Sequence, residues 1–266
     1  MRLCSIASGS SGNCIYVGSD NTHILVDVGI SRKRIEEGLK KADLTGYDIT
    51  GILITHEHSD HIQGLGVLAR KYGIPMYATK GTIEGVLHSS RYLGEFDTGL
   101  FREIPVDEDV QIGDLKVHPF HISHDAIDPC GYRITSGESS VAIATDMGTF
   151  NKYIVEQLQN LDAILIEANH DVRMLQAGSY TYALKQRVMS DYGHLSNENS
   201  GLLLNQILHK GLKHIMLGHL SKENNMPEIA YETVKFEINV ADTPFQAEDF
   251  HLCVAKRDEI SEILEF

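Results

Sequence analysis

The sequence predicts an α/β protein built from two β-sheets whose outer faces are covered by helices. Short apolar runs separated by glycines fill the first quarter of the chain, and helical and strand patterns alternate through the rest. Such an alternation favours sheets layered with helices. With 266 residues, of which 42% are hydrophobic and 23% charged, the chain is long enough to bury a sizeable core and has the composition of an ordinary globular protein.

The first third of the chain is expected to be rich in strands, because its apolar runs are short and end at glycines or polar turns. Ser31 is expected to cap a helix that extends to about residue 41. A second helix is expected at about 60–72, where apolar residues recur on one face. The strands are predicted at residues 3–7, 14–18, 23–27 and 51–55.

The remainder of the chain is expected to continue with a hairpin and then with alternating helices and strands. Two short strands near residues 110–119 precede the hairpin, which is formed by residues 131–135 and 139–145. Pro227 is placed at the start of the last helix, where its missing N–H is not needed. The other elements are helices at 151–159 and 196–208 and strands at 163–167, 214–217 and 252–256.

Charge and cysteine content restrict the function class. The formal net charge of -14 argues against a protein that coats nucleic acid, because phosphate binding relies on Lys and Arg, but it leaves open an enzyme that binds phosphate through metal ions. No apolar run approaches the ~20 residues of a membrane helix, and the first residues do not resemble a signal peptide. The four cysteines form no CxxC pair, so we expect a reduced, cytoplasmic setting and no membrane partner.

The strongest chemical signal is the segment THEHSDH at residues 55–61, which directly follows an apolar strand. It places three imidazoles and a carboxylate within six residues, and these groups bind Zn²⁺ and similar first-row metals. In the expected turn His56 and His58 can point one way, while Asp60 and His61 project from the first turn of a helix. One segment can therefore serve two adjacent ions. The alternative, a solvated polar loop with chance histidines, fits this position after a buried strand poorly.

The pattern THxHxDH resembles the signature of the metallo-β-lactamase fold, and the resemblance covers essentially the whole chain. It implies a four-layered αββα sandwich with a dinuclear site at one edge of the sheets. No β-CASP insertion is visible after Asp146, so residues 1–266 are expected to form one domain of this fold. The other family positions follow in order at Asp27, His124, Asp146 and His219.

Carried over residue by residue, the resemblance implies two divalent ions, Zn²⁺ or Mn²⁺, with iron as a further option. His121 competes with His124 for one ligand position, and His124 is preferred because Pro, Gly and Tyr follow it, as in the family's phosphodiesterase branch. Asp27 is expected to support the ligands from behind. The implied ligands are His56, His58 and His124 for the first ion, Asp60, His61 and His219 for the second, and Asp146 bridging both.

Two further segments resemble ribonuclease-Z-like enzymes of this fold. Glu167 ends an apolar strand in IEANH, and His194 lies in GHLS. The resemblance implies that His194 is a general acid and that Glu167 orients it, with Asp60 as a third catalytic residue. A proton donor is chemically required, because metal ions activate the attacking water but the leaving alkoxide still needs a proton. Taken alone, a histidine such as His194 is more often a surface residue that caps a helix.

The stretches NHDVRML, LKQR and GHLSNE, between residues 169 and 198, resemble the YycJ (WalJ, VicX) family of bacterial proteins, as does the opening ASGSSGN. This resemblance implies a metal-dependent nuclease, a 5′→3′ exonuclease on duplex DNA linked to mismatch repair. Where the family would place Pro and Trp, this chain has Tyr180 and Tyr182, which either stack on bases or pack in the core. The alternatives are an RNA-directed phosphodiesterase and a small-molecule hydrolase of the same fold that cleaves a thioester or lactone.

Other charged residues and histidines carry weaker signals. Residues 32–34, and Arg173 with Lys185 and Arg187, either follow a phosphate backbone or form solvated helix faces. The glycine-rich segment 8–13 lacks the lysine of a P-loop and is expected to form a tight turn near the site. Six other histidines lack ligand spacing and are interpreted as structural or surface residues: His23, His88, His118, His209, His214 and His251.

Overall fold

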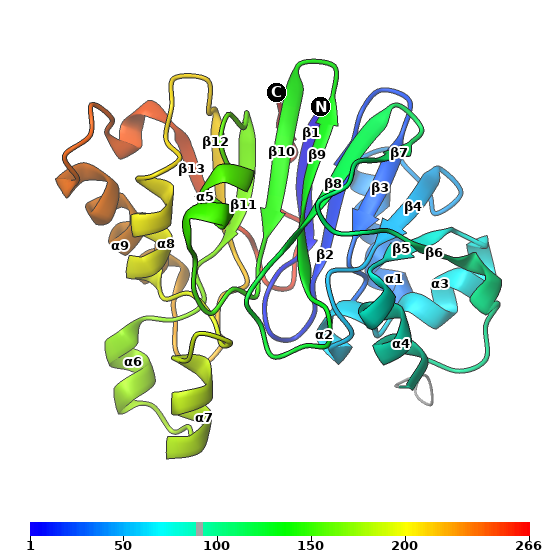
Figure 1. Ribbon diagram of the computed structural model, residues 1–266, viewed down its shortest axis with the longest axis horizontal. Coiled ribbons are helices and arrows are strands. Elements are labelled where there is room, and N and C mark those ends of the chain that lie inside the picture. Colours follow the sequence, from blue (N-terminus) through cyan, green and yellow to red (C-terminus); the bar gives the residue numbers. More distant parts are fainter. Residues whose placement is uncertain (89–92) are drawn as a thin grey trace.

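The computed structural model describes residues 1–88 and 93–266 and, within them, contains two seven-stranded β-sheets that face one another (Figure 1). The first sheet has the spatial order β14 (Leu264–Glu265), β1 (Arg2–Ala7), β2 (Cys14–Gly18), β3 (His23–Val26), β4 (Ile49–Leu53), β5 (Met76–Ala78) and β6 (Phe101–Glu103). The second has the order β13 (His251–Val254), β12 (His214–Gly218), β11 (Ala163–Glu167), β10 (Ser139–Ala144), β9 (Cys130–Ser136), β8 (Leu115–His121) and β7 (Val110–Ile112). The expected two-sheet architecture is confirmed.

Helices cover the outer faces of both sheets and also extend beyond the strand ends. They are α1 (Arg32–Lys41), α2 (Ser59–Ile62), α3 (Leu65–Tyr72), α4 (Lys80–His88), α5 (Lys152–Gln157), α6 (Val172–Ala177), α7 (Tyr182–Val188), α8 (Asn197–Leu204) and α9 (Pro227–Val240), with 3₁₀ turns η2 (Thr98–Leu100) and η3 (Ala247–Asp249). In Figure 1, α1, α3 and α4 lie outside the first sheet, α5, α8 and α9 lie outside the second, and α6 and α7 project beyond the strand ends. No helix in the described part of the chain has the length and apolarity to span a lipid bilayer.

Three apolar cores hold these layers together. The space between the sheets is filled from both sides, for example by Val17 and Leu53 of the first sheet and by Ile143 and Leu165 of the second. A further core lies between each sheet and its helices. Full burial of one such aliphatic side chain contributes about 1.5–3 kcal/mol. The two sheets are therefore fixed against each other, and strand ends from both are held at a common edge.

The helix expected at about 60–72 is in fact two helices, which is a correction to the sequence prediction. Helices α2 and α3 are separated at Gln63 and Gly64, where the Gly64 N–H donates to the Val28 carbonyl at 2.7 Å. A Cβ atom on Gly64 would lie 2.5 Å from the Ile30 carbonyl oxygen. The helix is interrupted here because its backbone contacts the loop that follows β3. Hydrophobic periodicity does not reveal such a contact.

Candidate metal centre

Strand ends from both sheets meet at the lower edge of the molecule in Figure 1. Strands β3 and β4 run parallel, as do β10, β11 and β12, so each set delivers its carboxyl ends to one edge. Three residues that follow these strands, Asp27, Asp146 and His219, have left-handed backbone with φ of 58°, 60° and 54°. For a residue with a Cβ atom this conformation costs about 1–2 kcal/mol. The surrounding contacts therefore impose it, and strain of this kind is typical of functional sites.

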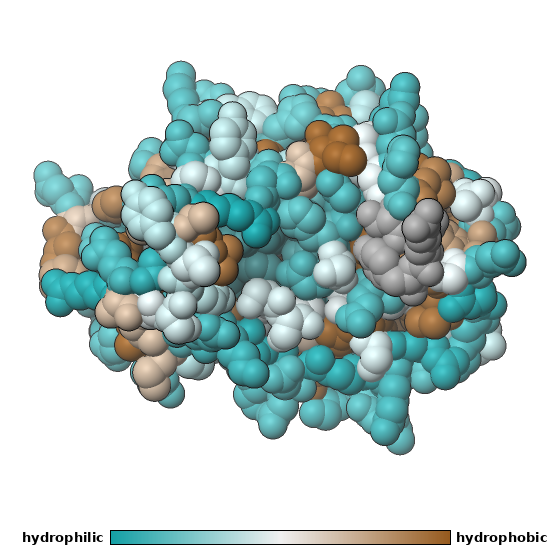
Figure 2. Space-filling view, turned by 90° about the horizontal axis from the view of Figure 1, so that it is seen from below, coloured by the Kyte–Doolittle hydropathy of each residue, from teal (hydrophilic) through white to brown (hydrophobic). Residues whose placement is uncertain are grey.

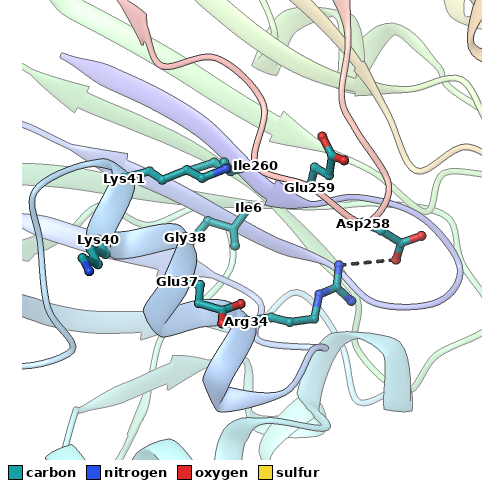
Figure 3. Close-up of a pocket in the computed structure, with 9 residues that line it drawn as sticks. All are labelled: Ile6, Arg34, Glu37, Gly38, Lys40, Lys41, Asp258, Glu259 and Ile260. Atoms are coloured by element: carbon teal, nitrogen blue, oxygen red, sulfur yellow. Dashed lines mark ion pairs between the residues drawn. The ribbon is translucent and has the colours of Figure 1, made fainter.

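Figure 2 shows this edge from below, with a hollow near its centre that is bordered mostly by hydrophilic residues in teal. A cavity of about 430 Å³ lies beside His124, with Thr149, Asn151 and Tyr192 among its lining residues. Another cavity, of about 500 Å³, lies between α1 and residues 258–260 (Figure 3). Its lining contains none of the predicted site residues, whereas the first cavity is lined in part by the predicted ligand His124.

His56, His58 and His124 form a first group of possible metal ligands. The His56 Nε2 lies 3.1 Å from the His58 Nδ1, which in turn lies 3.3 Å from the His124 Nε2. Nitrogen ligands of a tetrahedral zinc ion, with bonds of about 2.0–2.1 Å, are separated by about 3.3 Å. The backbone carbonyl of Gly193 lies 3.2 Å from the other His124 nitrogen and fixes that ring from behind. The three ring nitrogens therefore already have the spacing that a metal ion requires.

Asp60, His61 and His219 form a second group, and Asp146 lies between the two groups. The His61 Nε2 is 3.5 Å from a carboxylate oxygen of Asp60 and from the Asp146 Oδ2. The Asp146 Oδ1 is 3.2 Å from the His219 Nε2 and 3.9 Å from the His124 Nε2. Asp146 is only 2% exposed, yet its Oδ2 has no hydrogen-bond partner in the described residues. A buried carboxylate oxygen without a partner fits a bound cation.

Two of the ligand rings are held through the nitrogen that faces away from the cluster. The Asp27 Oδ2 lies 2.8 Å from the His61 Nδ1, and the Thr55 Oγ1 lies 3.0 Å from the His56 Nδ1. Asp27 also accepts the Thr55 backbone N–H at 2.9 Å, so the two supports are joined. These partners hold each ring in place, with its Nε2 directed toward the other ligands. The structure thus puts Asp27 where the sequence resemblance expects a supporting carboxylate.

Asn13 holds a third ring, a role that the sequence does not indicate. Its Oδ1 lies 3.1 Å from the His219 Nδ1 and accepts the Gly9 N–H at 2.9 Å. Its Nδ2 lies 3.2 Å from the His61 Nε2. The segment 8–13, predicted as a tight turn near the site, is confirmed as one and brings Asn13 between ligands of the second group. The predicted turn near the site was the one feature of the sequence that pointed toward Asn13.

Burial keeps most of these rings neutral, which is the form that binds metals. It lowers the pKa of His56 well below its usual value and that of His219 to about 4. Burial acts in the same direction on His61, but the carboxylates of Asp146 and Asp27 outweigh it and raise the pKa of that ring well above its usual value. Burial would raise the pKa of Asp146, yet the neighbouring His219 and His61 hold it well below its usual range. The centre therefore favours bound positive charge.

His194 and Glu167 form a hydrogen-bonded pair at the border of the cluster, with the ring Nδ1 2.7 Å from the Glu167 Oε1 and 3.7 Å from the Asp146 Oδ1. Glu167 is fully buried, and its other oxygen accepts the Met147 N–H at 2.8 Å. Burial acts to lower the pKa of His194, but the charge and hydrogen bond of Glu167 raise it to about 9. His194 does not cap a helix, because Ser196 caps α8. The pair leaves the His194 Nε2 available to a substrate.

Several other predicted positions lie outside the cluster. The side chain of His121 is 58% exposed and belongs to none of the ligand groups, so the structure brings His124 rather than His121 to the other ligands. Tyr182 on α7 is 78% exposed, which excludes core packing for it, whereas Tyr180 is half-buried. Arg187 forms an ion pair with Asp125 and so connects α7 to the loop that carries His124.

Comparison with known proteins places the chain in a family. The family model described as "Beta-lactamase superfamily domain" matches residues 22–213. The chain is 43% identical over 237 residues to "Exodeoxyribonuclease WalJ" of Streptococcus pneumoniae, with 89% of this chain and 88% of the relative covered. The chain belongs to the WalJ/YycJ family of the metallo-β-lactamase superfamily.

A second relative and one solved structure agree with this placement. "Exodeoxyribonuclease YycJ" of Bacillus anthracis is 42% identical over 234 residues, which cover 88% of each chain. The Zn²⁺-bound PqqB from Methylobacterium extorquens matches over 100% of both chains with a TM-score of 0.73 and 17% identity, which supports the fold. Family membership together with the two ligand groups identifies the chain as an enzyme, a metal-dependent hydrolase.

Proposed function

We propose that the chain is a dinuclear metal-dependent nuclease, a 5′→3′ exonuclease on double-stranded DNA with a role in mismatch repair. The observation that carries the proposal is the His194–Glu167 pair, set 3.7 Å from Asp146, because phosphodiester cleavage needs a proton donor for its leaving oxygen. Relatives named exodeoxyribonucleases support DNA as the substrate. The cleavage direction and the repair role rest on the family resemblance. Residues 1–266 would act as one domain without a β-CASP insertion, in the cytoplasm.

The ligand groups would divide between two ions. Their donor atoms are imidazole nitrogens and carboxylate oxygens without a thiolate, which suits Zn²⁺ or Mn²⁺ and, as a further option, iron. The proposed ligands are His56, His58 and His124 for one ion, Asp60, His61 and His219 for the other, and Asp146 for both.

The reaction divides between these ions and the chain's own residues. When bound, two divalent cations activate a water molecule for in-line attack on phosphorus and stabilise the attacking and leaving oxygens. Asp60 has the most exposed carboxylate of the centre, with 25% of its side chain accessible, and would orient the attacking water by accepting one of its hydrogens. Glu167 would hold the His194 ring, and the His194 Nε2 would donate the proton that the leaving oxygen needs. A general acid contributes about 10²–10⁴-fold to the rate.

DNA would lie across the edge beside α6 and α7. Tyr182 and Tyr192 are 78% and 62% exposed there, and stacking of a base on an aromatic ring contributes about 1–3 kcal/mol. Arg173 is also exposed on α6 and offers a cation to a backbone phosphate.

Linear duplex DNA labelled at either the 5′ or the 3′ end, incubated with Mn²⁺ or Zn²⁺, tests the proposal. The wild type is expected to release short products from the 5′ ends, Asp146→Asn to be inactive, and His194→Ala to be slower by at least ~10²-fold. His118→Ala is a matched control, because this histidine pairs with Asp109 outside the ligand groups. Cleavage of RNA alone would shift the substrate to RNA. Hydrolysis of a thioester or lactone with DNA and RNA left intact would identify a small-molecule hydrolase instead.

A further inference from the structure

A separate cluster of metal-ligating side chains lies at the end of the second sheet that is opposite the metal centre, where β12 and β13 begin. His214 and His251 are paired across these strands, and Cys253 lies two residues further along β13, on the same face as His251. Glu262 reaches the group from the segment between β13 and β14. Ligand atoms of His251, Cys253 and Glu262 lie within 4.8 Å of one another, and among residues 1–88 and 93–266 no other such group lies outside the metal centre.

Hydrogen bonds determine which nitrogen of His251 faces this group. The His214 Nε2 lies 3.1 Å from the Glu265 backbone carbonyl, which can only accept, so this nitrogen carries a hydrogen. In a neutral ring the second nitrogen, Nδ1, is then an acceptor. The His251 Nδ1, 3.1 Å away, must donate to it.

The other nitrogen of His251 is consequently a bare lone pair when that ring is neutral. This Nε2 lies 3.3 Å from a carboxylate oxygen of Glu262. Two acceptors at this separation repel each other unless a proton or a cation lies between them. A proton would join only these two atoms, whereas a metal ion would also engage the Cys253 sulfur. A nitrogen, a sulfur and an oxygen together form a donor set that suits Zn²⁺.

We propose that His251, Cys253 and Glu262 bind one Zn²⁺, with water as the fourth ligand and His214 orienting His251. A thiolate and a carboxylate neutralise the double positive charge, and binding releases the thiol proton to solvent. Because Glu262 lies between a strand of the second sheet and a strand of the first, the ion would fasten the C-terminal segment to both. This site is independent of the nuclease proposal.

Co²⁺ is the probe for this site, because a cobalt–thiolate bond gives a charge-transfer band in the near ultraviolet. The ligands proposed for the catalytic ions include no cysteine, and Cys4, Cys14 and Cys130 belong to none of the ligand groups. Titration of the metal-free 266-residue chain is expected to develop this band with one Co²⁺ per chain, beyond the ions of the catalytic centre. A folded wild type without the band, or with a band that needs a large excess of Co²⁺, would overturn the proposal.

Variants separate the two metal sites. Cys253→Ser is expected to abolish the band, Glu262→Gln to weaken Co²⁺ binding at this site by at least ~10-fold, and His58→Ala to retain the band. A band that persists in Cys253→Ser would refute the assignment. Glu262→Gln alters a side chain that is 54% exposed, so this variant is expected to fold. Added Zn²⁺ should raise the Tm of the wild type more than that of Glu262→Gln, and equal shifts would also refute the assignment.

Discussion

The two histidine groups at opposite ends of β12 differ in burial and in how their rings are held. His219, which follows the strand, is 1% exposed, and its second nitrogen is bound by Asn13. Beside the start of β12, at the first residue of β13, the side chain of His251 is 45% exposed, and its ring is held by the Nδ1 of His214 at 3.1 Å. Preformed ligands lose less conformational freedom on binding. We therefore expect the buried end at His219 to retain its ions, and the exposed end at His251 to exchange its ion with solvent.

Removing one histidine from each end gives the largest expected contrast. His58→Ala should lower the rate of DNA cleavage by about 10³-fold or more, because transition-state charge loses stabilisation of about 4 kcal/mol. His251→Ala should leave that rate near the wild-type value, since its group lies at the other end of the sheet. Initial rates at saturating Mn²⁺ measure both. Comparable losses in the two variants would mean that the distant group takes part in catalysis.

Acidic pH should lower the folding stability because of His170, a buried histidine at the catalytic end. This residue is 2% exposed, and burial lowers its pKa from 6.5 to about 4. The unfolded chain binds the proton more tightly, so the stability that the neutral ring contributes is fully present above about pH 6.5 and is lost as the pH falls toward 4, by about 2 kcal/mol at about pH 5.

Denaturant unfolding of the metal-free protein at about pH 7.5 and about pH 5 tests this, with the wild type losing about 2 kcal/mol more than His170→Asn. His118→Asn, which changes a partly exposed ring, is the control and should show the wild-type pH dependence. Identical curves for wild type and His170→Asn would show that another group senses the acid.

Removing the Asn13 side chain should loosen the His219 ring at the catalytic end. Asn13→Ala should raise the Mn²⁺ concentration needed for half-maximal activity by about 10–100-fold, because the His219 ring loses its partner. Asn13→Asp keeps an oxygen at that position and should recover most of the loss. Asn21→Ala, which alters an exposed asparagine, is the control. An unchanged Mn²⁺ requirement in Asn13→Ala would mean that packing alone orients the ring.

The smallest expected effect concerns the proposed DNA-binding face beside α6 and α7. Tyr182→Ala should raise the KM for duplex DNA by about 5-fold with little change in kcat, since one base–aromatic stack is lost. Tyr47→Ala removes a tyrosine of similar exposure, 76%, on the α1–β4 loop and should leave KM unchanged. A wild-type KM in Tyr182→Ala would place the DNA elsewhere on the surface.

Sequence patterns were sufficient where the chemistry is contiguous. Residues 55–61 carry four ligands in one turn, so spacing alone indicates a metal site there. Asn13 and His219 meet across 206 residues, and no local pattern connects them. The group at the start of β12 was missed for the same reason. His214 and His251 look like isolated surface histidines until the pairing of β12 with β13 brings them together.

Secondary structure shows the same division between local and distant causes. Strand β4 and helix α1 follow from an apolar run and a serine cap, and both are confirmed. Helices α6 and α7 are not indicated by periodicity, because each buries only one side chain, Leu175 in one and Val188 in the other. The separation of α2 from α3 at Gly64 arises from contact with the loop after β3, which the local sequence does not contain.

The left-handed backbone at Asp146 and His219 sets stability against activity at the same two positions. Glycine would adopt either conformation without a steric penalty, and each replacement would relieve about 1 kcal/mol of strain. The charges around Asp146 oppose this exchange, because its removal would take from the buried His61 and His219 rings a carboxylate that faces both. The strain at this edge is therefore maintained by the charges that meet there, and it can be relieved only by giving up the metal centre.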